Sequence, residues 1–236
     1  MVRQHYKKIQ VWIERNRFLL LLLSTILTMV LPAFSGTGML SEIIFVITMS
    51  FLFIQSMIVA SVKESRKRLL RVIVISMILM IWLKPAGFDS VYIDLIKLSF
   101  IVCFFIFVMT FLAKFIARSA SVNLNVLITA INIYLLAGII GASLSLAFFR
   151  IYPDAYNFPV YIERPDFVNF LYYSFITMST VGYGDITPRI QESQTLAYFI
   201  SITGQLYMAI IIAFIIGKLL MQSDQKKTDP GNNVND

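Results

Sequence analysis

Charged residues, glycine, proline, cysteine and histidine are all scarce in this chain of 236 residues. Asp, Glu, Lys and Arg together make up 14% of the sequence and hydrophobic residues 58%, whereas about a quarter of a soluble domain is charged. So little polar surface cannot cover a chain of this size in water, and the mean hydropathy of +0.78 agrees with that. With 7 prolines and 10 glycines, collagen-like and low-complexity classes are excluded. We therefore expect a membrane protein.

The residue types most often found in metal and redox sites are nearly absent. The one cysteine, Cys103, lies in an apolar run, and the one histidine, His5, lies in a basic amino-terminal segment. This excludes a disulfide framework, and neither residue can form a metal cluster or a catalytic pair with a like residue. The sequence has no recognisable nucleophile–base pair or nucleotide-binding loop. We expect neither an enzyme nor a bound cofactor.

Six apolar segments are long enough, or nearly so, to cross a bilayer as helices, which takes about 20 residues with a range of about 17 to 25. The segments are 18–34, 39–62, 69–83, 91–117, 123–149 and 193–221. The third is short, but Arg71 and Lys84 can extend from its ends toward the membrane surfaces. A cleavable signal peptide is the alternative for the first segment; the long basic region before it favours a retained helix. We predict an all-α membrane protein with six transmembrane helices.

If the chain crosses the membrane six times, its charged residues divide unequally between the two sides of the membrane. The cytoplasmic side receives fifteen bases and five acids, and the outer side four bases and eight acids. Because Lys and Arg accumulate in cytoplasmic loops, we predict that both termini are cytoplasmic, in a plasma (cell inner) membrane. The formal net charge of +7 thus indicates anionic lipid head groups as partners rather than nucleic acid. A basic arm, residues 1–17, is expected to lie on that leaflet as an interfacial helix.

A seventh apolar stretch, Phe167–Met178, is too short to span and is typical of a re-entrant segment. Asp166 precedes it at an N-cap position, where a carboxylate suits the positive end of a helix. Immediately beyond the stretch, residues 180–184 read Thr-Val-Gly-Tyr-Gly. Irregular backbone at membrane depth is tolerated only where it is buried in protein or lines a wet cavity.

The two glycines of this pentapeptide indicate what it does. Gly182 and Gly184 can adopt positive φ while their neighbours keep ordinary dihedrals. Alternating dihedrals turn successive carbonyl oxygens to the same side, where they can replace the water around a cation. One chain supplies one wall of such a site, so several copies are needed, and four fit a small ion.

The pentapeptide resembles the selectivity filter of potassium channels, and its surroundings resemble the bacterial type with one pore loop per chain. Tyr172 and Tyr173 stand where that family has paired aromatic residues in its pore helix, and Asp185 and Pro188 follow as the family places them. The resemblance implies a homotetramer whose K+ sites use backbone carbonyls and the Thr180 hydroxyl. The carbonyls are those of Thr180, Val181, Gly182 and Tyr183. It also implies that Tyr172, Tyr173 and Tyr183 form an aromatic cuff, with permeant K+ as the ligand.

The last span contains candidates for a gate. Gly204 lies 20 positions after Gly184, about where related channels have a hinge glycine, but a glycine that serves helix packing fits equally well. Met208, Ile212 and Ile215 recur at helical spacing and either line an inner cavity or face a core. In the fifth span, small residues are spaced for close packing against the sixth. These are Gly138, Gly141, Ala142 and Ser145.

The predicted organisation is a basic arm (1–17), a four-helix transmembrane domain (18–118), a pore domain of outer helix, pore helix, filter and inner helix (119–222), and a short polar tail (223–236). The fourth span has no base at every third position after Lys97, so it lacks a voltage sensor, and Asp94 is expected to neutralise Lys97. We expect a passive potassium channel. Two alternatives stay open: a potassium transporter subunit working with cytosolic regulators, and a non-conducting structural or regulatory membrane subunit.

Overall fold

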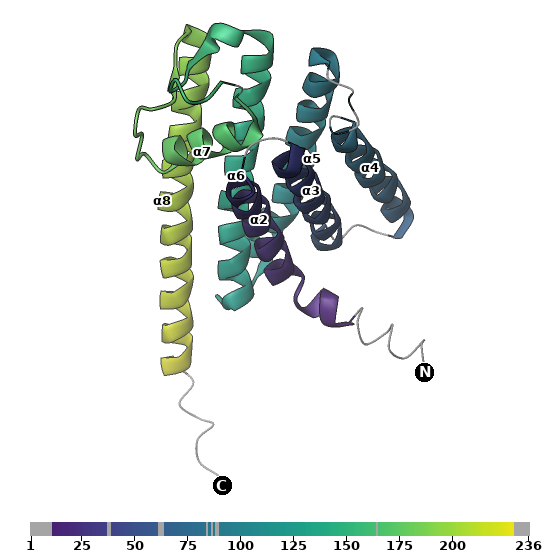
Figure 1. Ribbon diagram of the computed structural model, residues 1–236. Helices are drawn as coiled ribbons and strands as arrows, with labels where there is room; N and C mark the ends of the chain where they lie inside the picture. Colours follow the sequence, from purple (N-terminus) through teal and green to yellow (C-terminus); the bar gives the residue numbers. More distant parts are fainter. Residues whose placement is uncertain are drawn as a thin grey trace.

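The computed structural model describes residues 11–36, 39–60, 64–83, 85, 87, 90–163 and 165–228, and nearly all of their regular structure is helical (Figure 1). The helices are α2 (Arg17–Phe34), α3 (Met39–Val59), α4 (Glu64–Trp82), α5 (Val91–Arg118), α6 (Leu124–Ile151), α7 (Phe167–Met178) and α8 (Gln191–Thr228). A 3-10 turn, η1 (Pro153–Ala155), and two short strands, β1 (Tyr156–Asn157) and β2 (Thr187–Pro188), surround α7 in sequence. The predicted all-α fold is confirmed.

Five of the described helices are long and apolar enough to cross a membrane, namely α2, α3, α5, α6 and α8. The third predicted span corresponds to α4, which does not qualify because its first two turns are rich in charged residues. The count of six spans therefore stays a prediction. Even so, α4 buries Leu70, Val74 and Met77 on one face and exposes the equally apolar Val72 and Leu79 on another. From Val72 onward α4 has no charged residue, and an apolar stretch of this kind suits a lipid-facing position.

The helices form two groups that lie side by side (Figure 1). One group contains α2, α3, α4 and α5, and the other contains α6, α7 and α8. The groups meet where α5 packs along α6, to which the short segment 119–123 connects it, and where α2 packs against α6. Asn132 of α6, which is completely buried, fastens the second contact because its Nδ2 donates to the Phe18 carbonyl oxygen at 2.9 Å. The predicted boundary at 118/119 falls in the connection between α5 and α6.

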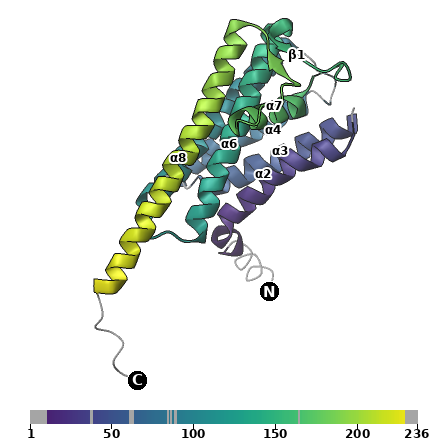
Figure 2. The ribbon, with the colours of Figure 1, turned by 90° about the vertical axis from the view of Figure 1, so that its left-hand side faces the viewer.

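The longest helix, α8, extends past the predicted end of the last span at residue 221 and continues to Thr228. Figure 2 shows its carboxyl-terminal half projecting away from the other helices. Leu206, Ile210, Ile216 and Leu220 are all exposed along it. One chain therefore leaves most of the apolar surface of α8 uncovered. Residues 1–10 of the predicted arm and 229–236 of the predicted tail lie outside the described residues.

Candidate ion-conduction site

A reciprocal cap holds the amino end of α7. The Asp166 carboxylate accepts hydrogen bonds from the backbone N–H groups of Val168 (2.9 Å) and Asn169 (3.1 Å), and the Asn169 side chain accepts from the Asp166 N–H (3.0 Å). This capping box pairs backbone groups that a helix otherwise leaves without partners. The predicted N-cap role of Asp166 is confirmed. The opposite end of α7, where the helix dipole is negative, leads directly into the irregular segment 179–186.

A two-stranded antiparallel sheet anchors both ends of the loop that contains α7. Tyr156 of β1 pairs with Pro188 of β2, and Asn157 pairs with Thr187. Just beyond β2, the buried Ser193 hydroxyl donates to the carbonyl oxygen of Ala155 at 2.8 Å. Burial raises the pKa of Tyr156 to about 12. The segment before α7 and the segment after residue 184 are thereby tied together.

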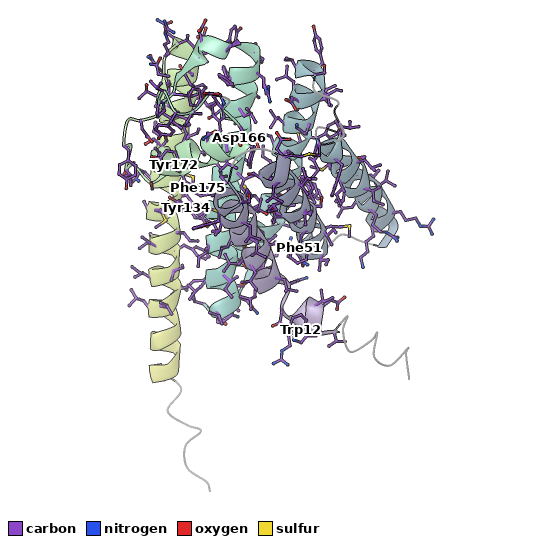
Figure 3. All side chains as sticks on the ribbon, in the orientation of Figure 1. Trp12, Phe51, Tyr134, Asp166, Tyr172 and Phe175 are labelled. Atoms are coloured by element: carbon purple, nitrogen blue, oxygen red, sulfur yellow. The ribbon has the colours of Figure 1, made fainter. Side chains whose placement is uncertain are left out.

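Small residues of α6 seat α7 against it. Figure 3 shows Phe175 on α7, and a Cβ on Gly138 of α6 would overlap with the ring of this phenylalanine. At Gly141 a Cβ would overlap with the Ser174 hydroxyl, which donates to the Gly138 carbonyl oxygen at 2.8 Å. From α8, the Ile200 side chain also comes within 3.3 Å of a Cβ placed at Gly141. The prediction that these small residues pack against the last span is confirmed at Gly141, through Ile200, while the closest contacts of Gly138 and Gly141 are with the re-entrant helix. For Ala142 and Ser145 it stays a prediction.

The backbone of residues 180–184 alternates in handedness. Gly182 and Gly184 have φ of +54° and +82°, as predicted, and Thr180 has φ of +62°. Val181 and Tyr183 between them stay outside the positive-φ region. The prediction that the neighbours of the two glycines keep ordinary dihedrals is confirmed at Val181 and Tyr183, whereas the positive φ of Thr180, two residues before Gly182, was not predicted. The reason lies in local hydrogen bonds: the Thr180 N–H donates to the Thr177 carbonyl (3.0 Å) and the Thr180 hydroxyl to the Ser179 carbonyl (2.7 Å).

All five residues of this segment are exposed in the single chain. Val181 is 54% exposed and Tyr183 73%, although both are large hydrophobic side chains. Behind them, the Gly182 N–H donates to the Ile176 carbonyl oxygen at 3.1 Å, which fastens the segment to the end of α7. The segment is therefore well anchored on one side and open on the other, as expected for one wall of a shared site.

The three tyrosines predicted to form a cuff have different surroundings. Tyr172 donates from its hydroxyl to Asp185 Oδ2 at 2.7 Å, which links α7 to the end of the 180–184 segment. Tyr173 is buried on another face of α7, with its ring 5.3 Å from that of Tyr156. Tyr183 is exposed. Within the described part of one chain, no ring contact joins any two of these three tyrosines. A cuff would have to form between chains, and it stays a prediction.

The inner helix α8 meets the end of α7 at Gly204. A Cβ on Gly204 would overlap with the carbonyl oxygen and the side chain of Met178. Of the two interpretations left open for Gly204, packing is observed, and the hinge stays a prediction because α8 is continuous through this residue. Met208 and Ile212 are exposed and Ile215 is half-buried. Their place in a cavity or gate stays a prediction.

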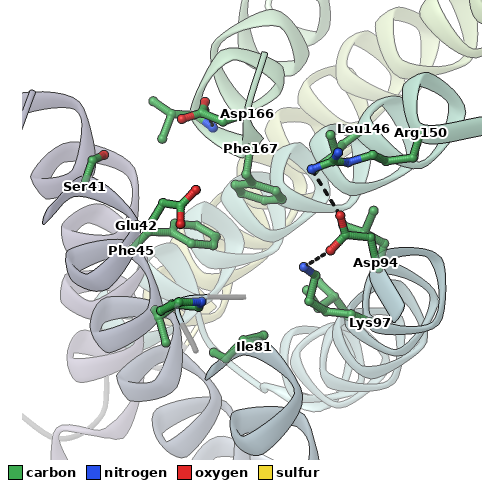
Figure 4. Close-up of a pocket in the computed structure, with 15 residues that line it drawn as sticks. Ser41, Glu42, Phe45, Ile81, Asp94, Lys97, Leu146, Arg150, Asp166 and Phe167 are labelled. Carbon is green, nitrogen blue, oxygen red and sulfur yellow. Dashed lines mark hydrogen bonds and ion pairs between the residues drawn. The ribbon is translucent and has the colours of Figure 1, made fainter. Parts of the chain in front are cut away.

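An ion-pair cluster connects the four-helix group to the other group. Asp94 of α5 is buried and pairs with Arg150 of α6 at 3.1 Å between Oδ2 and Nη2, and also with Lys97 (Figure 4). The predicted neutralisation of Lys97 by Asp94 is thus confirmed, and Arg150 is a partner that sequence reasoning missed. The cluster borders a cavity of about 70 Å³ that Phe167 of α7 also lines. Partners from different helices, far apart in sequence, leave no pattern that would have indicated this contact.

Comparison with known proteins bears on the part of the chain that this geometry singles out. Residues 128–221 match the family model described as "Ion channel". This part of the chain is similar to an ion channel domain. It runs from α6 to the apolar end of α8 and includes α7 and residues 180–184. No curated protein and no solved structure matches the chain. With its long apolar helices, the protein is a multi-pass, all-α membrane protein, and the similarity to an ion channel domain points to a non-enzymatic function.

Sequence reasoning also missed three polar residues of α8. Gln205 Nε2 donates to the Thr180 hydroxyl oxygen at 3.4 Å, and the Tyr207 hydroxyl donates to the Ala130 carbonyl oxygen at 2.6 Å. Lys218 donates to the carbonyl oxygens of Ile116 (3.3 Å) and Ser119 at the end of α5. The signal that could have found them is simple. Each is a polar or amphipathic side chain inside an otherwise apolar span, where such groups need a partner.

Proposed function

We propose that the protein is a potassium channel subunit and that four copies surround a pore lined by residues 180–184. The observation that carries the proposal is the alternation of backbone handedness, with positive φ at Thr180, Gly182 and Gly184 and not at Val181 or Tyr183. This alternation allows successive carbonyl oxygens to face one side, where they replace the hydration shell of a permeant ion. The preference for K+ over Na+ rests on the resemblance of the pentapeptide to potassium channel filters.

The exposed surfaces support an assembly of several chains. The 180–184 segment has one anchored side and one open side, and α8 leaves its apolar surface uncovered. Ion channel families commonly form oligomers, and a ring around the open side of residues 180–184 would cover both surfaces. We propose the homotetramer on this ground, in a plasma membrane with anionic lipid at the cytoplasmic face and both termini in the cytoplasm.

The electrostatics of the segment favour a cation. The negative dipole end of α7 adjoins residue 180, and Asp185 follows Gly184 at the other end of the segment. Asp185 is held toward α7 by Tyr172. A passing cation would therefore meet favourable partial or full negative charge at both ends of the carbonyl column.

The test uses the full chain reconstituted in liposomes, with K+ and Na+ fluxes measured separately and Ba2+ as blocker. We expect K+ to pass much faster than Na+, and Ba2+ to block. Gly182→Ala is expected to abolish conduction, because an alanine is strained at the φ of +54° that residue 182 adopts.

Gly36→Ala is the matched control. Gly36 has φ of +77° and, like Gly182, has open space around it, but it lies in the connection between α2 and α3. The same backbone strain is thereby introduced outside the proposed pore, and conduction should persist. A Gly182→Ala tetramer that conducts like the parent would overturn the proposal. A parent protein that assembles but passes no K+ would favour a non-conducting regulatory subunit.

A further inference from the structure

Gln205 is the polar side chain of α8 that reaches the 180–184 segment. Its Nε2 donates to the Thr180 hydroxyl oxygen at 3.4 Å, and the residue is exposed in the single chain. The preceding residue, Gly204, brings the backbone of α8 against the carbonyl oxygen of Met178 at the end of α7. This contact sets the position of α8 relative to α7, and so places the Gln205 amide beside the first residue of the segment.

The hydrogen bonds of Thr180 leave a defined part of its hydroxyl available. The hydroxyl proton is donated to the Ser179 carbonyl oxygen at 2.7 Å, and one lone pair accepts from Gln205. A hydroxyl has one proton and two lone pairs, so one lone pair is left for a ligand. A cation can bind to this remaining lone pair of Thr180, because the hydroxyl proton is donated to the Ser179 carbonyl oxygen and does not repel it. Gln205 therefore helps to keep the Thr180 oxygen oriented as a cation ligand.

The Gln205 amide oxygen has no hydrogen-bond partner among the described residues. An amide oxygen is a neutral acceptor, comparable to the backbone carbonyls of residues 180–184. In a tetramer, four such oxygens would stand in a ring next to the Thr180 hydroxyls, at the inner end of the carbonyl column.

We propose that Gln205 is a specificity-determining residue and that four Gln205 amides form a cation site at the inner mouth of the filter. The inference rests on the proposed tetrameric channel. The site takes small cations, K+ in passage and Ba2+ as a blocker. Its amides replace part of the ion's water before the ion reaches Thr180. Because the amides are uncharged, they hold an ion weakly enough for it to move on, as conduction requires.

The test measures K+ conductance and Ba2+ block in planar bilayers, with Ba2+ added to each side in turn. Gln205→Glu places carboxylates at the site, and one carboxylate about 6 Å from a divalent ion changes its affinity by about tenfold in water. We expect Ba2+ block to strengthen by at least that factor when Ba2+ is added to one side of the bilayer, and not when it is added to the other side. Gln205→Leu removes the amide, and we expect conductance to fall severalfold and Ba2+ block to weaken. Gln205→Asn, which keeps a shorter amide, should lie between Gln205→Leu and the parent.

Gln194→Glu and Gln194→Leu are matched controls, because Gln194 is an exposed glutamine near the start of the same helix and contacts Arg189 instead of residues 180–184. The Ba2+ block and the K+ conductance of these two variants should equal those of the parent. Assembly of every variant is checked by its tetramer mass in detergent. If Gln205→Glu and Gln205→Asn assemble and keep the parent's Ba2+ affinity and conductance within twofold, the inference is wrong while the channel proposal stands. If the parent conducts no K+, the channel proposal itself fails.

Discussion

The Tyr172 hydroxyl donates to Asp185 Oδ2 at 2.7 Å, across a separation of 13 residues in sequence. The bond spans residues 180–184 and joins α7 to the point where the irregular segment ends. The other carboxylate oxygen of Asp185 is buried and has no hydrogen-bond partner among the described residues. Tyr172 is therefore the main support of a carboxylate that stands next to Gly184.

Removing this hydroxyl tests whether the bond holds the filter. In Tyr172→Phe, Asp185 loses a charge-assisted hydrogen bond of a kind that contributes about 1.5–3 kcal/mol. We expect the tetramer to persist and the preference for K+ over Na+ to fall about tenfold, measured as a shift in reversal potential between KCl and NaCl solutions. Tyr92→Phe is the control, because Tyr92 is 79% exposed near the start of α5. Unchanged selectivity in Tyr172→Phe would show that Asp185 needs no such support.

Gly204→Ala distinguishes a packing glycine from a hinge. The added methyl group would meet backbone, which cannot move aside as a side chain can. We expect the melting temperature of the detergent-solubilised protein to fall, with an overpacking cost of about 1–3 kcal/mol. A pure hinge would instead leave thermal stability unchanged and alter only the fraction of time that the channel is open.

Gly217→Ala is the companion variant on the same helix. A Cβ at Gly217 meets nothing within 4 Å, so the substitution should be neutral or slightly stabilising, by at most about 1 kcal/mol from helix propensity. Equal destabilisation by both glycine substitutions would contradict the contact between Gly204 and Met178.

The pair Asp94–Arg150 is expected to be worth more than the exposed pair Asp154–Arg189. The Asp94 side chain is 6% exposed and that of Arg150 25%, so removing Arg150 leaves a largely desolvated carboxylate whose remaining partner is Lys97. We expect Arg150→Gln to lower the free energy of unfolding by about 2–3 kcal/mol. In a double-mutant cycle, Asp94→Asn should cost less in the Arg150→Gln background than in the parent protein. At the exposed pair Asp154–Arg189, separated by 3.9 Å, Asp154→Asn should change nothing measurable. Additive effects at Asp94 and Arg150 would refute direct coupling.

Lys218 is expected to hold α8 against the end of α5. Its ammonium group lies at the negative end of the α5 dipole, where it donates to the carbonyl oxygens of Ile116 and Ser119. Lys218→Met should destabilise the protein by about 1–2 kcal/mol, whereas Lys218→Arg should retain most of the stability. Lys114→Met, at an exposed lysine of α5, is the control for loss of one positive charge. A loss of stability as large in Lys114→Met would point to overall charge instead of this contact.

Features that depend on neighbours in the chain were predictable. The Asp166 cap and the positive φ at Gly182 and Gly184 were confirmed, because capping and backbone freedom are set within one helical turn. Helix α4 was predicted less well, since its apolar run is short and its first turns are charged. The left-handed conformation of Thr180 had no signal in residue type, because threonine rarely adopts it and here two local hydrogen bonds hold it.

By itself, the sequence determined that this is an all-α membrane protein and that an irregular, glycine-containing segment follows a helix too short to span. Hydropathy, helix length and capping suffice for both, since they are properties of contiguous residues. Only the tertiary structure decided which residues meet: Gly138 with Phe175, Asp94 with Arg150, and Gln205 with Thr180. Such pairings depend on the rotation and axial position of one helix against another. The rotation and the axial position of a helix result from packing over the whole bundle, so the sequence of one segment does not determine them.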